Sequence, residues 1–312
     1  GVQMKKIAVM GARGFVGHNL TEHLKNKYEV LPITRDNFNL LDEKAVELFL
    51  EQEQPEVVIN CTNQGGNRKV EAAGKPIDVI GNNLKMFFAQ ERCLSENMKM
   101  INFGSGAQYN KTRDLIKVKE KDFGEVIPSD DYGYSKYVME KYIRLKNQTG
   151  GNIYNPAIFG LYGPGEDYTF KFISNAIIKN MIQMPIVINQ NVVFDYLFLE
   201  DFLKIIDFII ENDCPNKEFN ITPTESIDLV TIAEYINRCS TYKSEIIVKN
   251  PGLNYQYTGD NARLLENMGH NFTFTSYEKG IEKLYRYYEE HIEELDLETI
   301  RSDELLKLCK TK

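Results

Sequence analysis

The sequence predicts an α/β protein in which a doubly wound parallel sheet is joined to a smaller, mixed α/β lobe. Short apolar strands alternate with helices over the first half of the chain, as in a parallel sheet that helices cover on both faces. A glycine-rich turn follows the first strand directly, and the alternation breaks after Tyr162-Gly163-Pro164-Gly165. The length of 312 residues agrees with two domains, or with one domain and a large lobe.

The alternation begins with Lys6–Met10, a short apolar run with flanking charge that is typical of a buried parallel strand. Apolar residues at helical spacing over Phe15–Leu24 predict the first helix. Strands and helices are then expected in turn at Tyr28–Ile33, Glu43–Gln52, Glu56–Asn60, Leu84–Asn97, Met100–Gly104, Tyr134–Gln148 and Asn152–Phe159.

The second half of the chain predicts helices without regular strands between them, which indicates a lobe that closes over the carboxyl ends of the strands. These helices are expected near Thr169–Met181, Glu200–Glu211, Thr231–Cys239 and Glu278–His291. The last twenty residues, rich in Glu, Leu and Lys, are interpreted as a solvated helical tail.

Composition and charge exclude several classes of protein. A net charge of −8 argues against binding to nucleic acid or to an anionic membrane. The best apolar run, Phe202–Ile210, is short and interrupted by charge, so no membrane span is expected. The five cysteines form no CxxC pair and the N-terminus shows no signal peptide, which predicts a reduced, cytoplasmic protein. No metal site is expected, since His18 and His23 lack a third ligand.

The turn after the first strand reads Gly11-Ala12-Arg13-Gly14-Phe15-Val16-Gly17 and predicts dinucleotide binding. Gly11 suits a tight turn, Gly14 the approach of a pyrophosphate, and Gly17 close packing of the helix on the sheet. The N–H groups that open the helix at Phe15 and Val16 are then available for the phosphates. A purely structural turn is the alternative.

The charges near the second strand favour NADP(H) over NAD(H), which stays possible. An NAD site usually has Asp or Glu at the end of that strand, but this chain has Thr34-Arg35-Asp36, with Arg13 in the glycine turn. Two guanidiniums suit the 2′-phosphate of NADP. Asp36 could serve NAD if the register differs by one residue, and both arginines could instead be solvated surface charges.

Tyr132 and Lys136 spell YxxxK and lie on one face if the segment is helical. A nearby ammonium stabilises a phenolate, so Tyr132 could exchange a proton with a substrate hydroxyl or ketone. Ser105 follows the strand Met100–Gly104 and is expected to face the cofactor crevice, where its hydroxyl could donate to a carbonyl oxygen. The alternative for Ser105 is a simple turn cap, and Cys61 is interpreted as a buried filler rather than a redox-sensitive thiol.

These motifs resemble those of the extended short-chain dehydrogenases/reductases of the NAD(P)-dependent epimerase/dehydratase family, which act on nucleotide sugars. The resemblance runs from Lys5 to about Tyr288 and is strongest, in the N-terminal half, to GDP-L-fucose synthase and related 4-keto-sugar reductases. It implies a Rossmann-type domain of residues 1–163 plus about 192–222, and a nucleotide-sugar lobe of residues 164–191 plus 223–312. It also implies a homodimer.

The resemblance implies a role for each matched position. Ser105, Tyr132 and Lys136 would be the catalytic residues, with Tyr132 and Lys136 also at the nicotinamide ribose. The further residues implied for the cofactor are Arg35, Asp42, Asn60, Cys61, Thr62 and Asn83. The residues implied for the substrate are Gln64, Ser105, Gly106 and Lys171.

Departures from the family pattern narrow the expected reaction. Ala107 stands where the fucose synthases carry a catalytic Cys, and Lys171 lies near the position of their His, which argues against epimerisation at C3 and C5. Gly106 and Ala107 replace the Asp-Glu pair of the sugar dehydratases, which argues against dehydration. Ala157 and Phe194 replace arginines that relatives carry. Arg144, Lys171 or Arg263 could take over binding of the diphosphate.

The sequence thus predicts an NADP-dependent reductase of a nucleotide-linked 4-keto-6-deoxy sugar, without C3/C5 epimerisation. A nucleotide-sugar 4-epimerase with tightly bound NAD is the alternative. A non-catalytic dinucleotide-binding protein is a third hypothesis, against which the presence of all three catalytic residue types counts.

Overall fold

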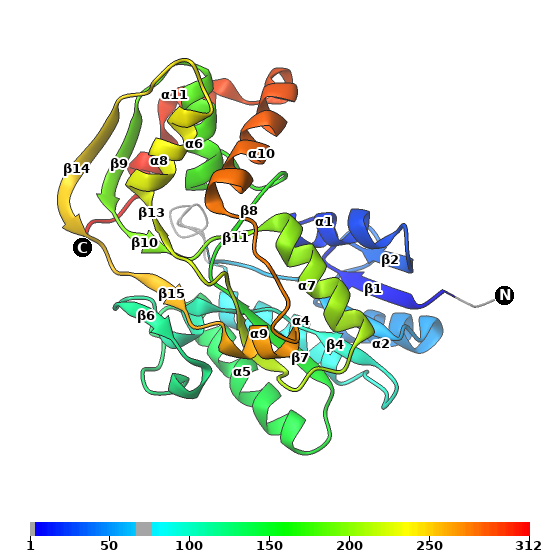
Figure 1. Cartoon of the computed structure of the whole chain (residues 1–312). Helices are drawn as coiled ribbons and strands as arrows, with labels where there is room; N and C mark the ends of the chain where they lie inside the picture. The colour runs from blue at the N-terminus through cyan, green and yellow to red at the C-terminus, as the bar shows by residue number, and fades with distance from the viewer. Residues whose placement is uncertain (1–3, 67–76) are drawn as a thin grey trace.

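A computed structural model describes residues 4–66 and 77–312 of the chain (Figure 1). Residues 1–3 and 67–76 lie outside the described part. Figure 1 shows a lower lobe around a central sheet and an upper lobe of helices and short strands, with the described C-terminus on the upper lobe.

The lower lobe contains the predicted doubly wound parallel sheet, which is therefore confirmed. Seven strands belong to this sheet within the described residues, and every pairing between them is parallel. Their spatial order is β12 (Glu218–Ile221), β7 (Ile153–Ile158), β4 (Lys99–Ile101), β3 (Val57–Asn60), β1 (Lys6–Met10) and β2 (Glu29–Ile33), with β5 (Gly104–Ser105) also paired to β7.

Helices cover both faces of this sheet because successive strand residues point to opposite sides. In β1, Ile7 and Val9 belong to one apolar core while Ala8 and Met10 belong to another. The first core is shared with α1 (Phe15–Leu24), α7 (Leu199–Glu211) and α9 (Ala262–Asn267). The opposite face is covered by α2 (Glu43–Glu53), α4 (Val79–Glu91) and α5 (Asp131–Gln148).

Two expected elements differ from the structure for local reasons. The helix expected at Leu84–Asn97 is α4, which begins earlier because the Asp78 carboxylate caps it by accepting the Gly81 N–H. The strand expected at Met100–Gly104 is divided into β4 and β5. Between them, the Asn102 side chain and the Phe103 carbonyl bond to side chains from β3, β7 and α5.

The upper lobe combines helices with strands of three small sheets. Its longer helices are α6 (Phe172–Met181), α8 (Leu229–Arg238) and α10 (Tyr277–Glu290), close to the expected positions. One sheet has the order β13 (Ile227–Asp228), β10 (Val193–Phe194), β15 (Tyr257–Gly259) and β6 (Leu115–Val118), and it runs from the upper lobe at β13 to the lower lobe at β6 (Figure 1). The two-stranded sheets pair β11 (Leu197–Phe198) with β8 (Leu161–Tyr162), and β14 (Ile246–Leu253) with β9 (Ile186–Asn191). The short 3₁₀ turns are η1 (Gly106–Tyr109), η2 (Glu120–Asp122) and η3 (Ile292–Glu294).

The C-terminal segment is not the solvated tail that the sequence predicts. It forms two short helices, α11 (Leu297–Ser302) and α12 (Glu304–Leu308). Ile300 is fully buried in the core of the upper lobe, and Asp303 forms an ion pair of 2.8 Å with the buried ammonium of Lys179. Buried apolar area and a desolvated ion pair therefore hold this segment against α6 and β9.

One part of the segment assigned by sequence to the second lobe packs on the first. Leu264 of α9 is buried in the same core as β1 and α7, and Phe272 and Phe274 pack against that core. A side-chain amide from α9, that of Asn267, also bonds to Asn216 just before β12. The chain after residue 260 therefore returns to the parallel sheet before it enters α10.

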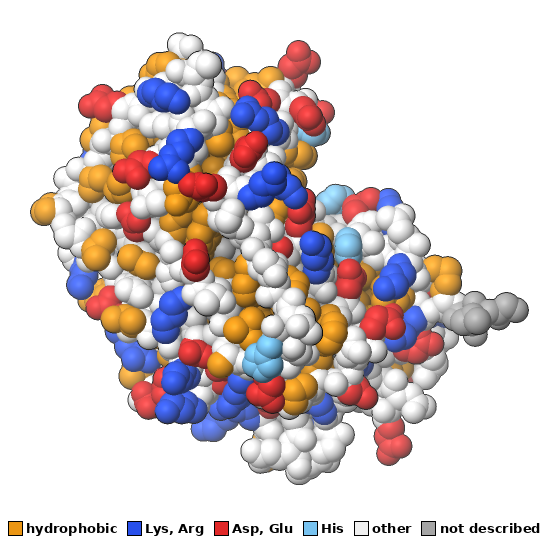
Figure 2. All heavy atoms as spheres, in the orientation of Figure 1, with side chains coloured by type: hydrophobic (Ala, Val, Ile, Leu, Met, Phe, Trp, Pro, Cys, Tyr) orange, Lys and Arg blue, Asp and Glu red, His pale blue; other side chains and the backbone are white. Residues whose placement is uncertain are grey.

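No helix in residues 4–66 and 77–312 is long and apolar enough to cross a membrane. Figure 2 shows acidic and basic side chains interspersed over both lobes on the face in view.

Candidate active site

The glycine turn between β1 and α1 has the geometry that the sequence predicts for each glycine. Gly11 has a φ of 84°, and a Cβ there would lie 2.9 Å from the backbone of Cys61 and Thr62. At Gly17 a Cβ would lie 2.1 Å from the Gly11 carbonyl oxygen, so only glycine lets α1 pack on the turn. Nothing lies within 4 Å of a Cβ at Gly14, which caps α1 without a side-chain hydrogen bond. This open helix N-terminus fits the pyrophosphate of a dinucleotide.

Arg13 and Arg35 lie at the surface beside this turn. The Arg13 guanidinium forms an ion pair with Asp36, and both side chains are exposed. Asp36 is therefore neutralised by an arginine of the turn, and Arg35 is exposed next to it. Asp42, which the resemblance assigns to the cofactor, caps α2 by accepting the N–H groups of Lys44 and Ala45.

The segment after β3 packs against the ring of Tyr132. A Cβ at Gly66 would lie 2.7 Å from that ring, so the glycine allows the backbone to reach it. Asn83 holds the segment through two hydrogen bonds with the backbone of Gln64, of 2.8 and 2.9 Å, and Asn82 binds the Gln64 side chain. In this structure Asn83 thus orders the chain that carries Gln64.

Ser105, Tyr132 and Lys136 lie together at the carboxyl ends of the central strands. Tyr132 lies in the first turn of α5, whose N-cap Asp130 accepts the Gly133 N–H at 2.8 Å. The Tyr132 hydroxyl lies close enough to Ser105 to interact with it electrostatically. The Lys136 ammonium lies 5.6 Å from the centre of the Tyr132 ring and donates to the Phe103 carbonyl at 2.8 Å. Ser105 also caps η1 by accepting the Ala107 N–H, so the turn-cap interpretation and the placement beside Tyr132 both hold.

Burial shifts the protonation of this group. Desolvation lowers the pKa of Lys136 from 10.5 to about 8. Desolvation also raises the pKa of Tyr132, against the smaller opposing effect of the nearby Ser105 hydroxyl. Desolvation also raises the pKa of Cys61 to about 12, so its thiol stays protonated. Cys61 is only partly buried, where it packs against the core of the lower lobe, and is not the fully buried residue that the sequence predicts.

A chain of buried amides lies behind these residues. Asn60, Asn102 and Asn155, from β3, the β4–β5 junction and β7, are joined side chain to side chain at 2.8 and 2.9 Å. Asn60 also accepts the Thr62 N–H at 3.0 Å. Because these bonds cross the strand ends, they fix the backbone that carries the catalytic group.

Glu140 is connected to Ser105 by hydrogen bonds through one intervening residue, Gln108. Gln108 donates to the Glu140 carboxylate at 3.0 Å and accepts the Ser105 N–H at 3.3 Å. Burial raises the pKa of Glu140 to about 7. Sequence reasoning missed this residue, although its place one helical turn after Lys136 was a usable signal.

Tyr257 is a second residue of the site that sequence reasoning did not identify. It comes from β15, and its hydroxyl lies close enough to Ser105 and Tyr132 to interact with both electrostatically. A Cβ at Gly106 would lie 2.5 Å from that hydroxyl, so Gly106 leaves room for it. No sequence motif connects residues so far apart, and only the sheet β13-β10-β15-β6 brings them together.

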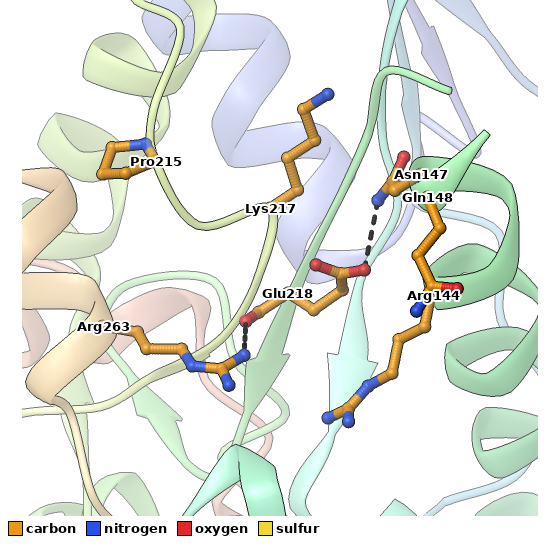
Figure 3. Close-up of a pocket in the computed structure, with 7 residues that line it drawn as sticks. All are labelled: Arg144, Asn147, Gln148, Pro215, Lys217, Glu218 and Arg263. Carbon is orange, nitrogen blue, oxygen red and sulfur yellow. Dashed lines mark hydrogen bonds between the residues drawn. The ribbon is translucent and has the colours of Figure 1, made fainter. Parts of the chain in front are cut away.

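Arg144 and Arg263, two of the three cations expected to bind the diphosphate, lie away from the catalytic group. Arg144 and Arg263 line a cavity of about 410 Å³ with Lys217 and Glu218 (Figure 3). Glu218 begins β12, so this cavity lies at the amino ends of the strands, opposite the catalytic group. Of the three, Lys171 remains, exposed at the N-cap of α6.

No cluster of three metal-ligating side chains is found in the described part of the chain. His23 pairs with Asp207 at 2.7 Å, which gives it a packing role between α1 and α7.

Comparison with known proteins agrees with this geometry. A profile of the NAD dependent epimerase/dehydratase family matches residues 7–222. The GDP-6-deoxy-D-talose 4-dehydrogenase of Aggregatibacter actinomycetemcomitans is 24% identical over 303 residues, 90% of this chain and 97% of that protein. The GDP-L-fucose synthase of Sinorhizobium fredii is 24% identical over 78% of this chain and 82% of its own.

A solved structure shows the same fold. The GDP-L-fucose synthetase of Naegleria fowleri bound to NADP superimposes with a TM-score of 0.77 and 17% identity, covering 94% of this chain and 95% of that one. The parallel sheet, the glycine turn and the match over residues 7–222 lead to one conclusion: the chain belongs to the NAD dependent epimerase/dehydratase family of enzymes.

Proposed function

We propose that this protein uses NADPH to reduce the ketone of a nucleotide-linked 4-keto-6-deoxy sugar, without inverting C3 or C5. One observation carries the proposal: Ser105, Tyr132 and Lys136 lie together beside the glycine turn, while Ala107, buried in η1, stands where an epimerising relative would carry an acid/base Cys. A methyl group cannot move the protons that epimerisation requires.

Each residue of the group has a role in the reduction. Tyr132 donates its proton to the ketone oxygen as that oxygen gains charge. The Ser105 hydroxyl donates a hydrogen bond to the same oxygen. Lys136, charged below its pKa of about 8, stabilises the tyrosinate that remains. When bound at the glycine turn, NADPH would supply the hydride for the carbonyl carbon.

The charges around the glycine turn support NADPH as the cofactor. Arg13 and Arg35 offer two exposed guanidiniums near the expected adenosine ribose, and the ion pair with Arg13 offsets the carboxylate of Asp36. Guanidiniums bind phosphate through charge-assisted, forked hydrogen bonds.

The relatives support redox chemistry at carbon 4. The Aggregatibacter relative is named as a dehydrogenase at carbon 4 of a GDP-linked 6-deoxy sugar, and the Naegleria structure holds NADP. Reduction of a 4-ketone is the reverse of such an oxidation. The homodimer stays a prediction of the family resemblance, and the cytoplasmic location stays a prediction of the sequence.

The test is loss of NADPH absorbance with a panel of GDP-, dTDP- and UDP-linked 4-keto-6-deoxy sugars, with NADH in parallel. We expect stoichiometric consumption with one member of the panel. Purified protein that retains oxidised NAD tightly and consumes no NADPH with any sugar would overturn the proposal in favour of a 4-epimerase.

A variant pair tests the role of Tyr132. Tyr132→Phe is expected to lower kcat about 10²- to 10⁴-fold with NADPH binding unchanged, since only the proton donor is removed. Tyr134→Phe is the matched control, because this neighbouring tyrosine of α5 is 40% exposed. Turnover by Tyr132→Phe at the wild-type rate would exclude the assigned proton donor.

A further inference from the structure

Tyr257 places a third hydroxyl in the catalytic group. A Cβ at Gly106, the residue after Ser105, would lie 2.5 Å from its oxygen, so the Tyr257 hydroxyl lies beside the turn that carries Ser105. It is also close enough to Ser105 and Tyr132 to interact with both electrostatically. The hydroxyls of Ser105, Tyr132 and Tyr257 therefore lie in one region of the site, and Tyr257 is partly exposed.

The ring of Tyr257 is held by aromatic neighbours from two other strand regions. Its centre lies 5.1 Å from that of Phe159, after β7, and 6.0 Å from that of Phe194 in β10, the latter at 90°. Phe194 occupies the place of a family arginine, so an aromatic packing partner stands where relatives carry a cation. Contacts of this kind fix the direction of a ring.

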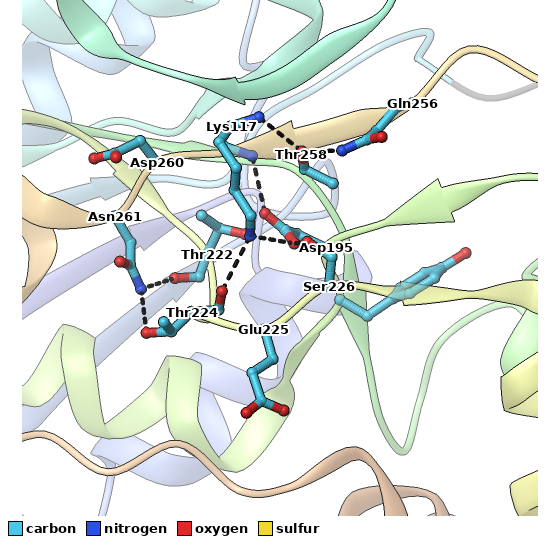
Figure 4. Close-up of polar contacts among 12 residues, drawn as sticks. Lys117, Asp195, Thr222, Thr224, Glu225, Ser226, Gln256, Thr258, Asp260 and Asn261 are labelled. Atoms are coloured by element: carbon cyan, nitrogen blue, oxygen red, sulfur yellow. Dashed lines mark hydrogen bonds and ion pairs between the residues drawn. The ribbon is translucent and has the colours of Figure 1, made fainter.

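The backbone on both sides of Tyr257 is fixed by a buried polar cluster (Figure 4). The Tyr257 carbonyl accepts the Asp195 N–H at 3.2 Å, and the Asp195 carboxylate accepts the Gly259 N–H at 2.9 Å. Lys117 pairs with Asp195 at 3.3 Å and donates its N–H to the Thr258 hydroxyl at 2.8 Å. The Tyr257 hydroxyl is thus presented by a rigid strand rather than by a loop.

The proton of this hydroxyl is available to a ligand. Desolvation raises the pKa of Tyr257 far above neutrality, so the group is a neutral phenol at physiological pH. Its O–H can therefore donate a hydrogen bond to a bound ligand.

We propose that Tyr257 binds the C3 hydroxyl of the sugar and so sets which 4-keto sugars the enzyme accepts. This inference rests on the proposed function, in which Ser105 and Tyr132 hold the ketone oxygen at C4. Tyr257 presents its hydroxyl beside Gly106, the residue after Ser105, and so within reach of an oxygen on a ring carbon next to C4. On the other side of C4, C5 carries the C6 methyl and the ring oxygen, so C3 alone offers a neighbouring hydroxyl.

A comparison of two substrates tests this assignment. The nucleotide 4-keto-6-deoxy sugar that the wild type reduces is measured beside its 3-deoxy counterpart, with the wild type and with Tyr257→Phe. The substitution removes one hydroxyl and keeps the ring and its packing. We expect kcat/KM to fall about 10- to 100-fold with the 3-hydroxy sugar and to stay within about twofold with the 3-deoxy sugar.

Tyr277→Phe is the matched control. Its hydroxyl bonds to the Glu225 carbonyl at 2.7 Å and accepts the Tyr196 N–H at 3.1 Å, within the upper lobe and away from Ser105. Loss of this hydroxyl is expected to leave the ratio of the two kcat/KM values unchanged. NADPH binding and thermal unfolding, measured for both variants, show that each one is folded.

The outcomes distinguish failure of the Tyr257 assignment from failure of the proposed reductase function. An equal fall with both sugars, or no fall with either, would overturn the assignment of Tyr257 while the reductase stands. A wild type that reduces no sugar would remove the proposed function, and with it this inference.

Discussion

The ammonium group of Lys136 lies where water has little access, between the Tyr132 ring and the Phe103 carbonyl. Desolvation disfavours its charged form and lowers its pKa to about 8. The charge that stabilises a tyrosinate is therefore present below pH 8 and is lost as the pH rises through that value. Tyr132, whose pKa is raised, keeps its proton over the same range.

We expect kcat/KM for sugar reduction to fall above about pH 8 as Lys136 loses its proton. A pH–rate profile from pH 6 to 10 measures this. In Lys136→Met the descending limb should disappear, with activity low at every pH. A wild-type profile that is flat to pH 10 would contradict the assigned role of the ammonium.

The double substitution of Arg13 and Arg35 by Ala tests whether these two residues make the protein prefer NADPH to NADH. We expect Kd for NADPH to rise about 10- to 100-fold, because two charge-assisted contacts to the 2′-phosphate are lost, while Kd for NADH changes little. Titration of the protein against each cofactor by fluorescence measures both constants. Arg92→Ala is the control, since Arg92 is exposed and pairs with Glu43 away from the glycine turn. Equal losses for the two cofactors would remove the argument for NADP.

The buried carboxyl of Glu166 stabilises the conformation of the segment from β8 to α6. Glu166 accepts the Gly163 N–H at 3.1 Å and the Ser174 hydroxyl at 2.7 Å, and so joins the turn after Tyr162 to the helix. Burial raises its pKa from 4.5 to about 7. Between these values the native state holds a proton that the unfolded chain has lost, so the stability that Glu166 contributes decreases as the pH rises from about 4.5 to 7.

Glu166→Gln keeps an acceptor for both donors and cannot ionise. We expect the free energy of unfolding of the variant, relative to wild type, to increase by on the order of 1–3 kcal/mol between pH 5 and pH 8. Urea unfolding of both proteins at the two pH values gives this difference. A variant that follows the pH dependence of the wild type would show that Glu166 is ionised in the native state throughout.

At the scale of the whole molecule, hydrogen bonds join the lower lobe to the upper lobe. Asp201 of α7 accepts the N–H and the hydroxyl of Thr275 at 2.8 and 2.9 Å, just before α10 enters the upper lobe. The C-terminal helices complete the upper core, in which Ile300 is fully buried. Stability of the upper lobe therefore depends on residues that come last in the chain.

Ile300→Ala is expected to lower the free energy of unfolding by about 2–4 kcal/mol, through lost burial and the cavity left behind. Ile116→Ala is the matched control, because Ile116 is 65% exposed, and it should change stability by less than about 0.5 kcal/mol. Chemical denaturation of the wild type and the two variants measures these changes in the free energy of unfolding. Equal small effects would mean that the C-terminal segment does not stay docked in solution.

The sequence determined most of the lower lobe and the central residues of the site. Apolar strands with flanking charge, glycines at fixed spacing and the YxxxK pair are local patterns, and local patterns predict elements and their order. They placed Gly11, Gly17 and the pair Tyr132 and Lys136 as the structure has them. They were also enough for the α/β class, since alternating strands and helices leave few other arrangements.

Tertiary structure alone decided which distant residues meet at that site. Tyr257 reaches Ser105 because β15 pairs with β6 and β10, and Arg144 is excluded from the site because an 18-residue helix carries it to the opposite end of the strands. The tail docks for a similar reason: Ile300 finds an apolar surface that no local pattern reveals. Contacts between residues more than a hundred positions apart follow from how the sheets and helices pack, and a single sequence carries no periodic signal of that packing.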